Sequence, residues 1–314
     1  MGKIAFVFPG QGSQSVGMGL DVFNNYDCAK KVYEKADEIL GRKISEICFN
    51  GPEEELKQTQ NTQPAILTTS LALLETLKQI SGVTPDYVAG HSLGEYAALY
   101  ESGALSIETT LKLIQKRADA MSKVKGGSMA AIIGLSDEQV KDILVKVTSG
   151  YVDVANYNCP GQVVITGEED AVEEAKNLLS QAGAKRALTL PVSGAFHSKM
   201  MKEASEEFSN GLDKIEINDA KIPVVTNVDA KSTTKSEEFR EKMPRQIYSS
   251  VYWTQSVQKM IENGVDTFVE IGNGKVLAGL IKKISKEVNI YNVYDLQTVE
   301  EVSKLIREQD KNDR

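Results

Sequence analysis

The sequence predicts an α/β protein with a central, mostly parallel sheet and a small ferredoxin-like subdomain inserted into it. Two observations support this prediction. Short apolar runs alternate with helical patterns through the first 126 residues, which is typical of a parallel, doubly wound sheet. Residues 127–192 then follow the order β-α-β-β-α-β, the order of the ferredoxin-like split unit. A chain of 314 residues is long enough for both parts.

The predicted large domain comprises residues 1–126 and 193–314. Its first strand is "KIAFVF" at 3–8, a continuous apolar run typical of a buried strand. A helix is expected from Pro64, with Thr62 as its cap. The other expected elements are strands at 87–89, 222–228 and 267–272 and helices at 93–102, at 107–123, from Lys199 and around 254–262.

The predicted insert begins where the texture of the sequence changes, at Gly126 and Gly127. A length of about 65 residues suits such a module. A substrate is expected in the cleft between the two parts. The expected strands of the insert are 128–135, 151–158, 161–167 and 185–193, and its helices are 136–147 and 169–183.

Composition excludes several classes of function. The chain is 41% hydrophobic and 25% charged, as a soluble globular protein is, and its net charge of −8 argues against nucleic acid as the main partner. The apolar stretch at its N-terminus is too short for a signal peptide and no stretch is long enough for a membrane span, so we expect neither. The three cysteines lie far apart, which favours a reducing compartment and no structural metal. We therefore expect a cytoplasmic protein without membrane, metal or nucleic-acid partners.

The stretch "GHSLGEYAAL" at 90–99 places Ser92 between two glycines where a strand gives way to a helix. This pattern is typical of the nucleophile elbow of α/β-hydrolase-like domains, in which a tight turn exposes the serine oxygen. The large domain is therefore predicted to be hydrolase-like. The alternative is a capping box, in which Ser92 and Glu95 only cap the helix.

A serine nucleophile needs a base, and the chain has only two histidines. His91 precedes Ser92 and would point away, which leaves His197, at the return from the insert. The group that orients His197 stays open: it is a backbone carbonyl or one of Asp153, Asp170 and Asp295. A thiol pair of Cys159 with His197 is a weaker alternative, because no basic neighbour is evident.

Two further residues are candidates for binding a substrate. Gln11 lies in "FPGQGSQ" at 8–14, which lacks the phosphate-loop signatures; it is either part of a plain turn or an oxyanion donor, together with the Leu93 N–H. Arg117 lies on the apolar side of its helix, among Leu113 and Ala118. Three interpretations of this arginine are open: an internal carboxylate pairs with it, its side chain extends to solvent at the edge of the helix, or it binds a carboxylate of the substrate.

Together these residues resemble the malonyl-CoA:acyl carrier protein transacylases, an acyltransferase family of fatty acid synthesis. The resemblance runs over nearly the whole chain. It rests on "FPGQGSQ" (8–14), "TQPA" (62–65), "GHSLGEYAAL" (90–99), "KRADAM" (116–121), "NYNCPGQVVITG" (156–167), "GAFHS" (194–198) and "GNGKVLAGL" (272–280).

The resemblance implies a role for each candidate residue. Ser92 would be the acylated nucleophile and His197 its base, with Gln11 and Leu93 as oxyanion donors. Arg117 would bind the malonyl carboxylate, and a main-chain carbonyl in "VYW" at 251–253, that of Tyr252, would orient the histidine. The remaining pocket residues implied are Gln63, Met121, Asn156 and Phe196, the last favouring malonyl over methylmalonyl groups.

The implied reaction is ping-pong transfer of malonyl from malonyl-CoA, through a malonyl-serine, to the phosphopantetheine thiol of acyl carrier protein. It needs no cofactor, and we expect a monomer. A basic rim for the acidic carrier is expected at Lys185, Arg186, Lys199 and Lys202. Two departures from the family pattern are Ser250, in place of a common proline, and Asn273, in place of the proline of Gly-Pro-Gly. The rival interpretations are an esterase or thioesterase and a non-catalytic acyl-chain or carrier-binding module.

Overall fold

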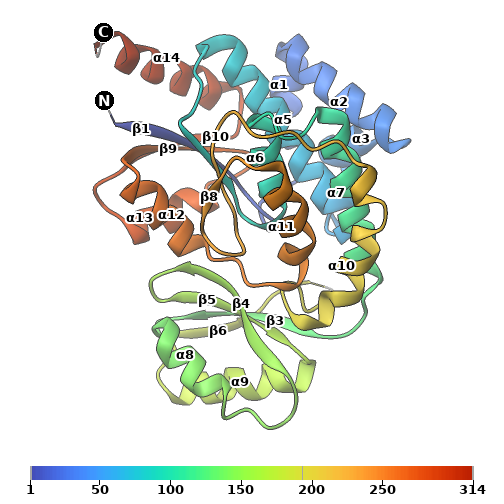
Figure 1. Ribbon diagram of the computed structural model, residues 1–314, viewed down its shortest axis with the longest axis vertical. Helices are drawn as coiled ribbons and strands as arrows, with labels where there is room; N and C mark the ends of the chain where they lie inside the picture. The colour runs from blue at the N-terminus through green and yellow to red at the C-terminus, as the bar shows by residue number, and fades with distance from the viewer. Residues whose placement is uncertain (1, 193, 313–314) are drawn as a thin grey trace.

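The computed structural model describes residues 2–192 and 194–312 and contains two sheets (Figure 1). The larger sheet has six strands in the order β10-β9-β1-β2-β7-β8. All its neighbouring strands are parallel except β7 and β8. This confirms the predicted mostly parallel sheet. The strands are β1 (Lys3–Phe8), β2 (Tyr87–Gly90), β7 (Val224–Val225), β8 (Ser232–Thr233), β9 (Val265–Ile271) and β10 (Asn289–Val293).

Strand β1 is apolar on both faces because helices cover both sides of the sheet. Phe6 and Phe8 belong to a core shared with α5 (Thr59–Ser81) and α7 (Ile107–Lys123), whereas Ala5 and Val7 pack with α12 (Trp253–Glu262) and α13 (Val276–Ile284). Figure 1 shows these helix pairs on opposite sides of the strands. The other helices of this part are α1 (Leu20–Asn25), α2 (Asp27–Leu40), α3 (Ile44–Asn50), α4 (Glu53–Leu56), α6 (Glu95–Glu101), α10 (Lys202–Ser209), α11 (Ser236–Tyr248) and α14 (Leu296–Asn312).

The smaller sheet is antiparallel, with the order β4-β5-β3-β6, and α8 and α9 cover one of its faces (Figure 1). The chain passes through it in the predicted β-α-β-β-α-β order, which confirms the ferredoxin-like arrangement. The exact boundaries, an insert at 127–192 and a large domain that resumes at 193, stay a prediction, and Ser193 lies outside the described residues. The elements are β3 (Ser128–Ile133), α8 (Asp137–Leu144), β4 (Val152–Cys159), β5 (Gln162–Gly167), α9 (Glu169–Gln181) and β6 (Arg186–Thr189).

Backbone hydrogen bonds join the small sheet to the large part. The Val251 N–H donates to Ala155 at 2.8 Å, and the Tyr157 N–H donates to Val251 at 2.9 Å. Strand β4 is therefore continued by the segment that leads into α12. This junction fixes Asn156 over the carboxyl edge of the large sheet, where β1 and β2 end side by side with Phe8 opposite Gly90.

Helix α5 begins at Thr59, so the predicted start at Pro64 is wrong. Pro64 cannot donate to the Gln60 carbonyl, four residues earlier. That carbonyl instead accepts from the Arg42 guanidinium at 2.7 Å and from the Gln115 amide at 3.4 Å, so the helix tolerates the proline. The Thr62 hydroxyl donates to the Leu56 carbonyl rather than capping the helix.

Several other predicted elements are shorter than expected. The strand at 222–228 is reduced to Val224–Val225, because Thr226 turns back and its N–H donates to the Lys231 carbonyl at 3.0 Å. The helix at 93–102 becomes a 3₁₀ turn, Ser92–Gly94, followed by α6, and the strand at 185–193 is reduced to β6. No helix in the described part of the chain has the length and apolar composition that crossing a membrane requires.

Candidate active site

Ser92 lies at the tip of the sharp turn between β2 and α6. Its φ of 53° is left-handed, which is uncommon for a residue with a Cβ. A Cβ at Gly90 would collide with the Gly94 backbone, and one at Gly94 would collide with the Phe8 carbonyl, so both flanking glycines are required. The capping-box interpretation is wrong, because Ser92 makes no cap and Glu95 accepts from the Asn227 N–H at 2.7 Å.

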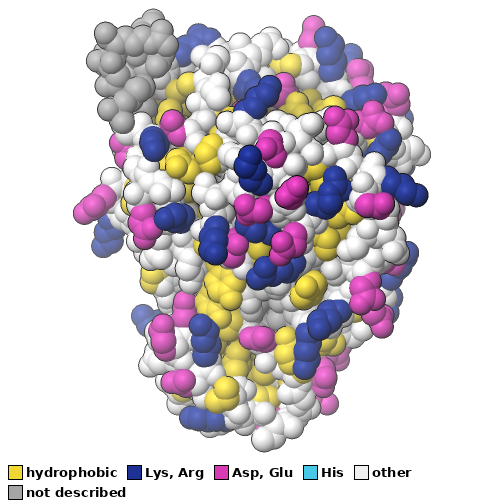
Figure 2. Space-filling view, viewed as in Figure 1, with side chains coloured by type: hydrophobic (Ala, Val, Ile, Leu, Met, Phe, Trp, Pro, Cys, Tyr) yellow, Lys and Arg dark blue, Asp and Glu magenta, His cyan; other side chains and the backbone are white. Residues whose placement is uncertain are grey.

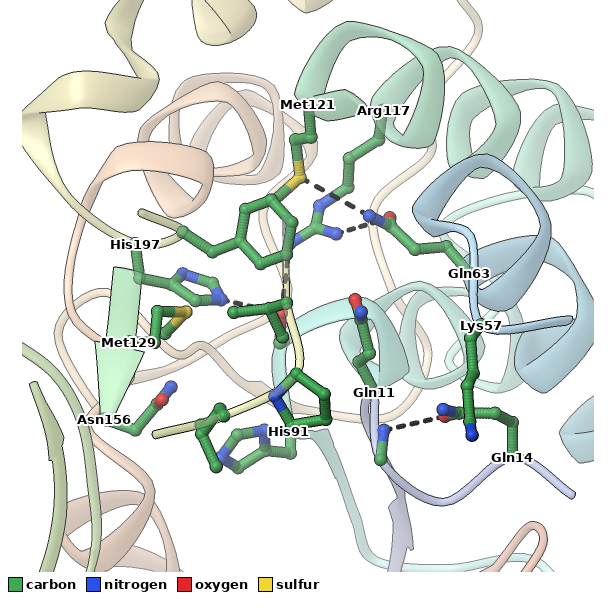
Figure 3. Close-up of a pocket in the computed structure, with 16 residues that line it drawn as sticks. Gln11, Gln14, Lys57, Gln63, His91, Arg117, Met121, Met129, Asn156 and His197 are labelled. Carbon is green, nitrogen blue, oxygen red and sulfur yellow. Dashed lines mark hydrogen bonds between the residues drawn. The ribbon is translucent and has the colours of Figure 1, made fainter. Parts of the chain in front are cut away.

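His197 meets Ser92 from the opposite side of the pocket, although 105 residues separate them in the sequence. Its Nε2 lies 2.8 Å from the Ser92 Oγ, and its side chain is buried (Figure 3). The φ of His197 is 57°, so both members of the pair have left-handed backbones. This contact is what a hydroxyl nucleophile and its base require.

Backbone carbonyls orient the imidazole. The His197 Nδ1 lies 2.9 Å from the Gln246 carbonyl and 3.2 Å from the Ser249 carbonyl, so Nδ1 carries the proton and Nε2 accepts from Ser92. The prediction of Tyr252 is wrong. Its carbonyl accepts from the Ser256 N–H and hydroxyl within the first turn of α12. Backbone carbonyls thus orient His197, which is the role that an acidic side chain has in a Ser-His-Asp triad and that the sequence left open.

Burial keeps His197 neutral. Burial, together with the positive charge of Arg117, lowers the pKa of this imidazole to about 3, against the opposing effect of the two carbonyls. A neutral imidazole with Nδ1 protonated has a free lone pair on Nε2 and can accept the serine proton.

Arg117 is a fully buried cation with neutral partners. It donates to the Gln63 side chain at 2.5 Å, the Gln246 side chain at 3.0 Å and the Ser92 Oγ at 3.1 Å. Only 1% of the residue is exposed, so it does not reach the edge of its helix. Among the described residues no carboxylate lies within ion-pair distance of it, although the buried Glu95 interacts with it electrostatically, and its Nε has no hydrogen-bond partner. A buried guanidinium of this kind favours an anionic ligand.

A cavity of about 190 Å³ opens above Ser92 between the two sheets. Figure 3 shows Gln11, Gln63, Arg117, Met121 and His197 pointing into it; Arg117 and Met121 come from α7, and the others from separate segments. Predicted residues that line it are Gln11, Gln63, Ser92, Arg117, Met121, Asn156, Phe196 and His197; residues that were not predicted are Gly12, Gln14, Lys57, His91, Met129, Leu190, Pro191 and Val192. Leu93 and Tyr252 are outside this lining.

Gln11 lies on a loop that the rest of the molecule holds tightly. Within the loop, the Ser13 hydroxyl donates to the Gly10 carbonyl at 2.9 Å. From outside, the Asn273 amide donates to the Ser13 carbonyl at 2.5 Å and to the Ser15 hydroxyl at 2.9 Å. Gln11 therefore lies on a fixed turn beside Ser92, as an oxyanion donor requires.

The other histidine and the alternative nucleophile are structural. His91 Nε2 lies 2.9 Å from the Asn158 Oδ1, and its ring meets Trp253 edge-on. Cys159 is buried in the core under the sheet, and burial raises the pKa of its thiol. The Nε2 of His197 is already bonded to Ser92, so the geometry does not support a thiol pair.

Sequence reasoning missed two residues that contact Ser92. Gln246, on α11, donates to the Ser92 carbonyl at 3.0 Å, and Asn227 accepts from the Ser92 N–H at 2.8 Å. Neither lies in a motif of catalytic spacing. The only signal for them is the burial of an amide side chain, which a sequence does not display.

Comparison with known proteins gives consistent results along the whole chain. Residues 5–314 match the family described as acyl transferase domain. The malonyl CoA-acyl carrier protein transacylase of Bacillus subtilis (strain 168) is 46% identical over 317 residues, covering 99% of this chain and all of that protein. That of Staphylococcus aureus (strain MSSA476) is 43% identical, covering 95% of this chain and 98% of that protein.

Solved structures of similar proteins superpose on nearly the whole chain. The malonyl CoA-acyl carrier protein transacylase from Clostridium perfringens superposes with a TM-score of 0.94 at 42% identity, covering 98% of each chain. A malonyl-transacylase in complex with its holo type II PKS acyl-carrier protein superposes with a TM-score of 0.93 at 38% identity, covering 96% of this chain and 99% of that one.

Proposed function

We propose that this chain, which belongs to the acyl transferase family, transfers a malonyl group from malonyl-CoA to the phosphopantetheine thiol of an acyl carrier protein. One observation carries the proposal: the 2.8 Å contact between Ser92 and a neutral His197, beside a buried Arg117 with neutral partners. The first pair suits acyl transfer, and a buried cation without an ion-pair partner suits an acyl group that ends in a carboxylate.

The first half-reaction forms the acyl-enzyme. His197 Nε2 takes the Ser92 proton as Oγ attacks the thioester carbonyl carbon. The oxyanion that forms is held by donors from Gln11 and the Leu93 N–H, each contributing about 3 kcal/mol to the transition state. The carbon–sulfur bond then breaks, the thiolate of coenzyme A takes the proton from His197, and malonyl-Ser92 remains.

The second half-reaction reverses these steps with a different thiol. His197 takes the proton of the carrier's phosphopantetheine thiol, and the sulfur attacks the malonyl ester. The carbon–oxygen bond to Ser92 breaks, and Oγ recovers its proton from His197. All proton transfers use one imidazole, and the proposed chemistry requires no cofactor.

Arg117 is proposed to select the acyl group. A malonyl carboxylate would take the place of neutral contacts on the guanidinium, with Gln63, Met121 and Asn156 around it. Phe196, which lines the same cavity, is proposed to restrict substituents on the carbon between the two carbonyls. A planar guanidinium binding a carboxylate through two hydrogen bonds fixes both distance and direction.

The carrier protein is proposed as the acceptor, in line with the relative solved with its own carrier. Figure 2 shows acidic and basic side chains interspersed over one face of the molecule, so an acidic partner needs a local basic rim. Four exposed cations are proposed for it: Lys185, Arg186, Lys199 and Lys202. Lys185 and Arg186 lie at the Ile133 end of β3, whereas Lys199, over the Tyr151 ring, lies at its Ser128 end. The monomeric state and cytoplasmic location stay predictions.

Intact mass spectrometry after mixing with malonyl-CoA or acetyl-CoA tests the proposal. The wild type should gain one malonyl group, and Ser92→Ala should gain none. Arg117→Ala should slow malonyl loading at least about 30-fold, because a buried charge pair loses one partner, and should slow acetyl loading much less. Folded wild type without an adduct would reject acyl transfer and leave a binding module. Equal losses for both acyl groups would remove Arg117 from carboxylate binding.

A further inference from the structure

The backbone of Ser92 is held on both sides by amide side chains from distant parts of the chain. Its N–H donates to the Asn227 Oδ1 at 2.8 Å, and its carbonyl accepts from the Gln246 Nε2 at 3.0 Å. These two residues lie 135 and 154 positions away in the sequence. The turn that presents the nucleophile is therefore restrained from outside its own segment.

Asn227 also spans the turn. Its Nδ2 donates to the Gly90 carbonyl at 2.7 Å, while its Oδ1 accepts from Ser92 two residues later. One side chain thus fixes the last residue of β2 and the nucleophile relative to each other. Asn227 is fully buried, so no water competes for these hydrogen bonds.

Glu95 and Tyr252 hold the backbone of Asn227. The Asn227 N–H donates to the Glu95 Oε2 at 2.7 Å, and its carbonyl accepts from the Tyr252 N–H at 3.0 Å. Glu95 is the first residue of α6 and is 2% exposed. Asn227 is therefore in contact with three points of the elbow: its start, its tip and its exit into the helix.

The conformation of Ser92 makes such a restraint necessary. A left-handed backbone costs a residue with a Cβ about 1–2 kcal/mol. The two flanking glycines have the widest choice of backbone angles and cannot hold it there. If the turn relaxed, the Oγ would move from His197, and a displacement of about 1 Å can cost about 100-fold in rate.

We propose that Asn227, seated by Glu95, is a positioning residue that holds the Ser92 backbone so that its hydroxyl stays on His197. The role of Ser92 as nucleophile rests on the proposed function, whereas the clamp itself rests on the hydrogen bonds above. Asn227 does not line the pocket that would hold the substrate, so its effect on the reaction comes through the turn that carries Ser92 and not through contact with the substrate.

A small uncharged reagent isolates this role from substrate binding. Phenylmethylsulfonyl fluoride sulfonylates an activated serine and carries no malonyl group. The second-order rate of Ser92 labelling, followed by intact mass, should fall about 100-fold in Asn227→Ala, from loss of alignment. The KM for malonyl-CoA should change less than about twofold, because binding contacts are untouched.

Asn61→Ala is the matched control. Asn61 is also a buried asparagine whose amide donates to a backbone carbonyl, that of Glu55 at 2.8 Å, and whose Oδ1 accepts from Arg42. It contacts neither Ser92 nor His197 through these bonds. Thermal melting should show a similar loss of stability in both variants, but only Asn227→Ala should lose labelling.

Substitutions at Glu95 keep the proposal testable if Asn227→Ala does not fold. Glu95→Ala should slow labelling at least about tenfold, and Glu95→Gln, which retains an acceptor for the Asn227 N–H, should restore most of that rate. Labelling of Asn227→Ala within about threefold of wild type, or an equal loss in Asn61→Ala, would overturn the proposal. A wild-type protein that is labelled by the reagent but never malonylated would reject malonyl-CoA as the substrate, while the proposal for Asn227 would still be tested by the labelling rates.

Discussion

At the scale of single residues, the pKa of His197 sets the acid limit of the reaction. Because burial and Arg117 lower this pKa to about 3, the imidazole stays neutral throughout the range where most serine–histidine pairs begin to titrate. The rate of Ser92 labelling by an uncharged reagent should therefore show no acid limb between about pH 5 and pH 8. The rate of labelling, followed by intact mass in samples quenched at successive times at each pH, tests this prediction.

A variant checks the cause of this shift. In Arg117→Met the nearby positive charge is gone, so the pKa of His197 should rise and the acid limb should move to higher pH. A wild-type limb near pH 6.5, the ordinary value for histidine, would contradict the account. The same pKa makes the stability of the fold depend on pH. Below pH 6.5 this histidine is protonated in the unfolded chain but not in the folded protein. The free energy of unfolding should therefore fall by about 1.4 kcal/mol for each pH unit between pH 6.5 and pH 3.

Local patterns predicted the residues that the structure brings together around Ser92. Two glycines about a serine, two histidines in the whole chain and an arginine on an apolar helix face each carry their own physical signal. The group that orients His197 carries none. It is the carbonyl of Gln246, in α11, with that of Ser249, just after the helix, and their position depends on how that helix packs beside the return at His197. The residue pattern left this group open, and Tyr252 was implied only by the family resemblance.

At the scale of elements, the turn after β9 supports the loop after β1. Asn273 donates two hydrogen bonds to the Gln11 loop, at Ser13 and Ser15, where the family pattern has a proline that could donate none. Asn273→Ala should lower kcat about tenfold with little change in KM, because the loop that carries Gln11, the proposed oxyanion donor, loses its support but the substrate contacts remain. Steady-state kinetics with malonyl-CoA measure both constants.

The comparison for Asn273→Ala is again Asn61→Ala, which loses hydrogen bonds without touching the loop. If kcat were unchanged in Asn273→Ala, the loop would hold its shape through internal bonds such as Ser13 to Gly10, and Asn273 would have no catalytic importance. If KM rose instead, the loop would bind substrate rather than stabilise the transition state.

Elements with a simple apolar period were predicted well, and those decided by distant partners were not. Strand β1 occupies the predicted residues, and α7 matches its predicted range of 107–123. The start of α5 depends on Arg42 filling the gap left by Pro64, and the end of β7 depends on the turn at Thr226. Neither partner can be read from the segment itself.

At the scale of the whole molecule, the site exists only because the two sheets meet. The large sheet supplies the elbow and the Gln11 loop, the small sheet supplies Met129 and Asn156, and the returning chain supplies Phe196 and His197. The order of the elements predicted this arrangement in outline. The hydrogen bonds of Val251 with β4, which set the height of the small sheet over Ser92, could not be predicted, because they pair segments about 95 residues apart.

A transferase, unlike a hydrolase, must pass the acyl group on Ser92 to a thiol and withhold it from water. Isolated malonyl-enzyme, divided between buffer alone and buffer with holo acyl carrier protein, tests it most directly. The carrier should gain the malonyl mass within seconds, as the enzyme loses it, while the adduct in buffer alone should persist far longer. Loss of the adduct at the same rate in both, with free malonate as the product, would show a hydrolase and contradict the account.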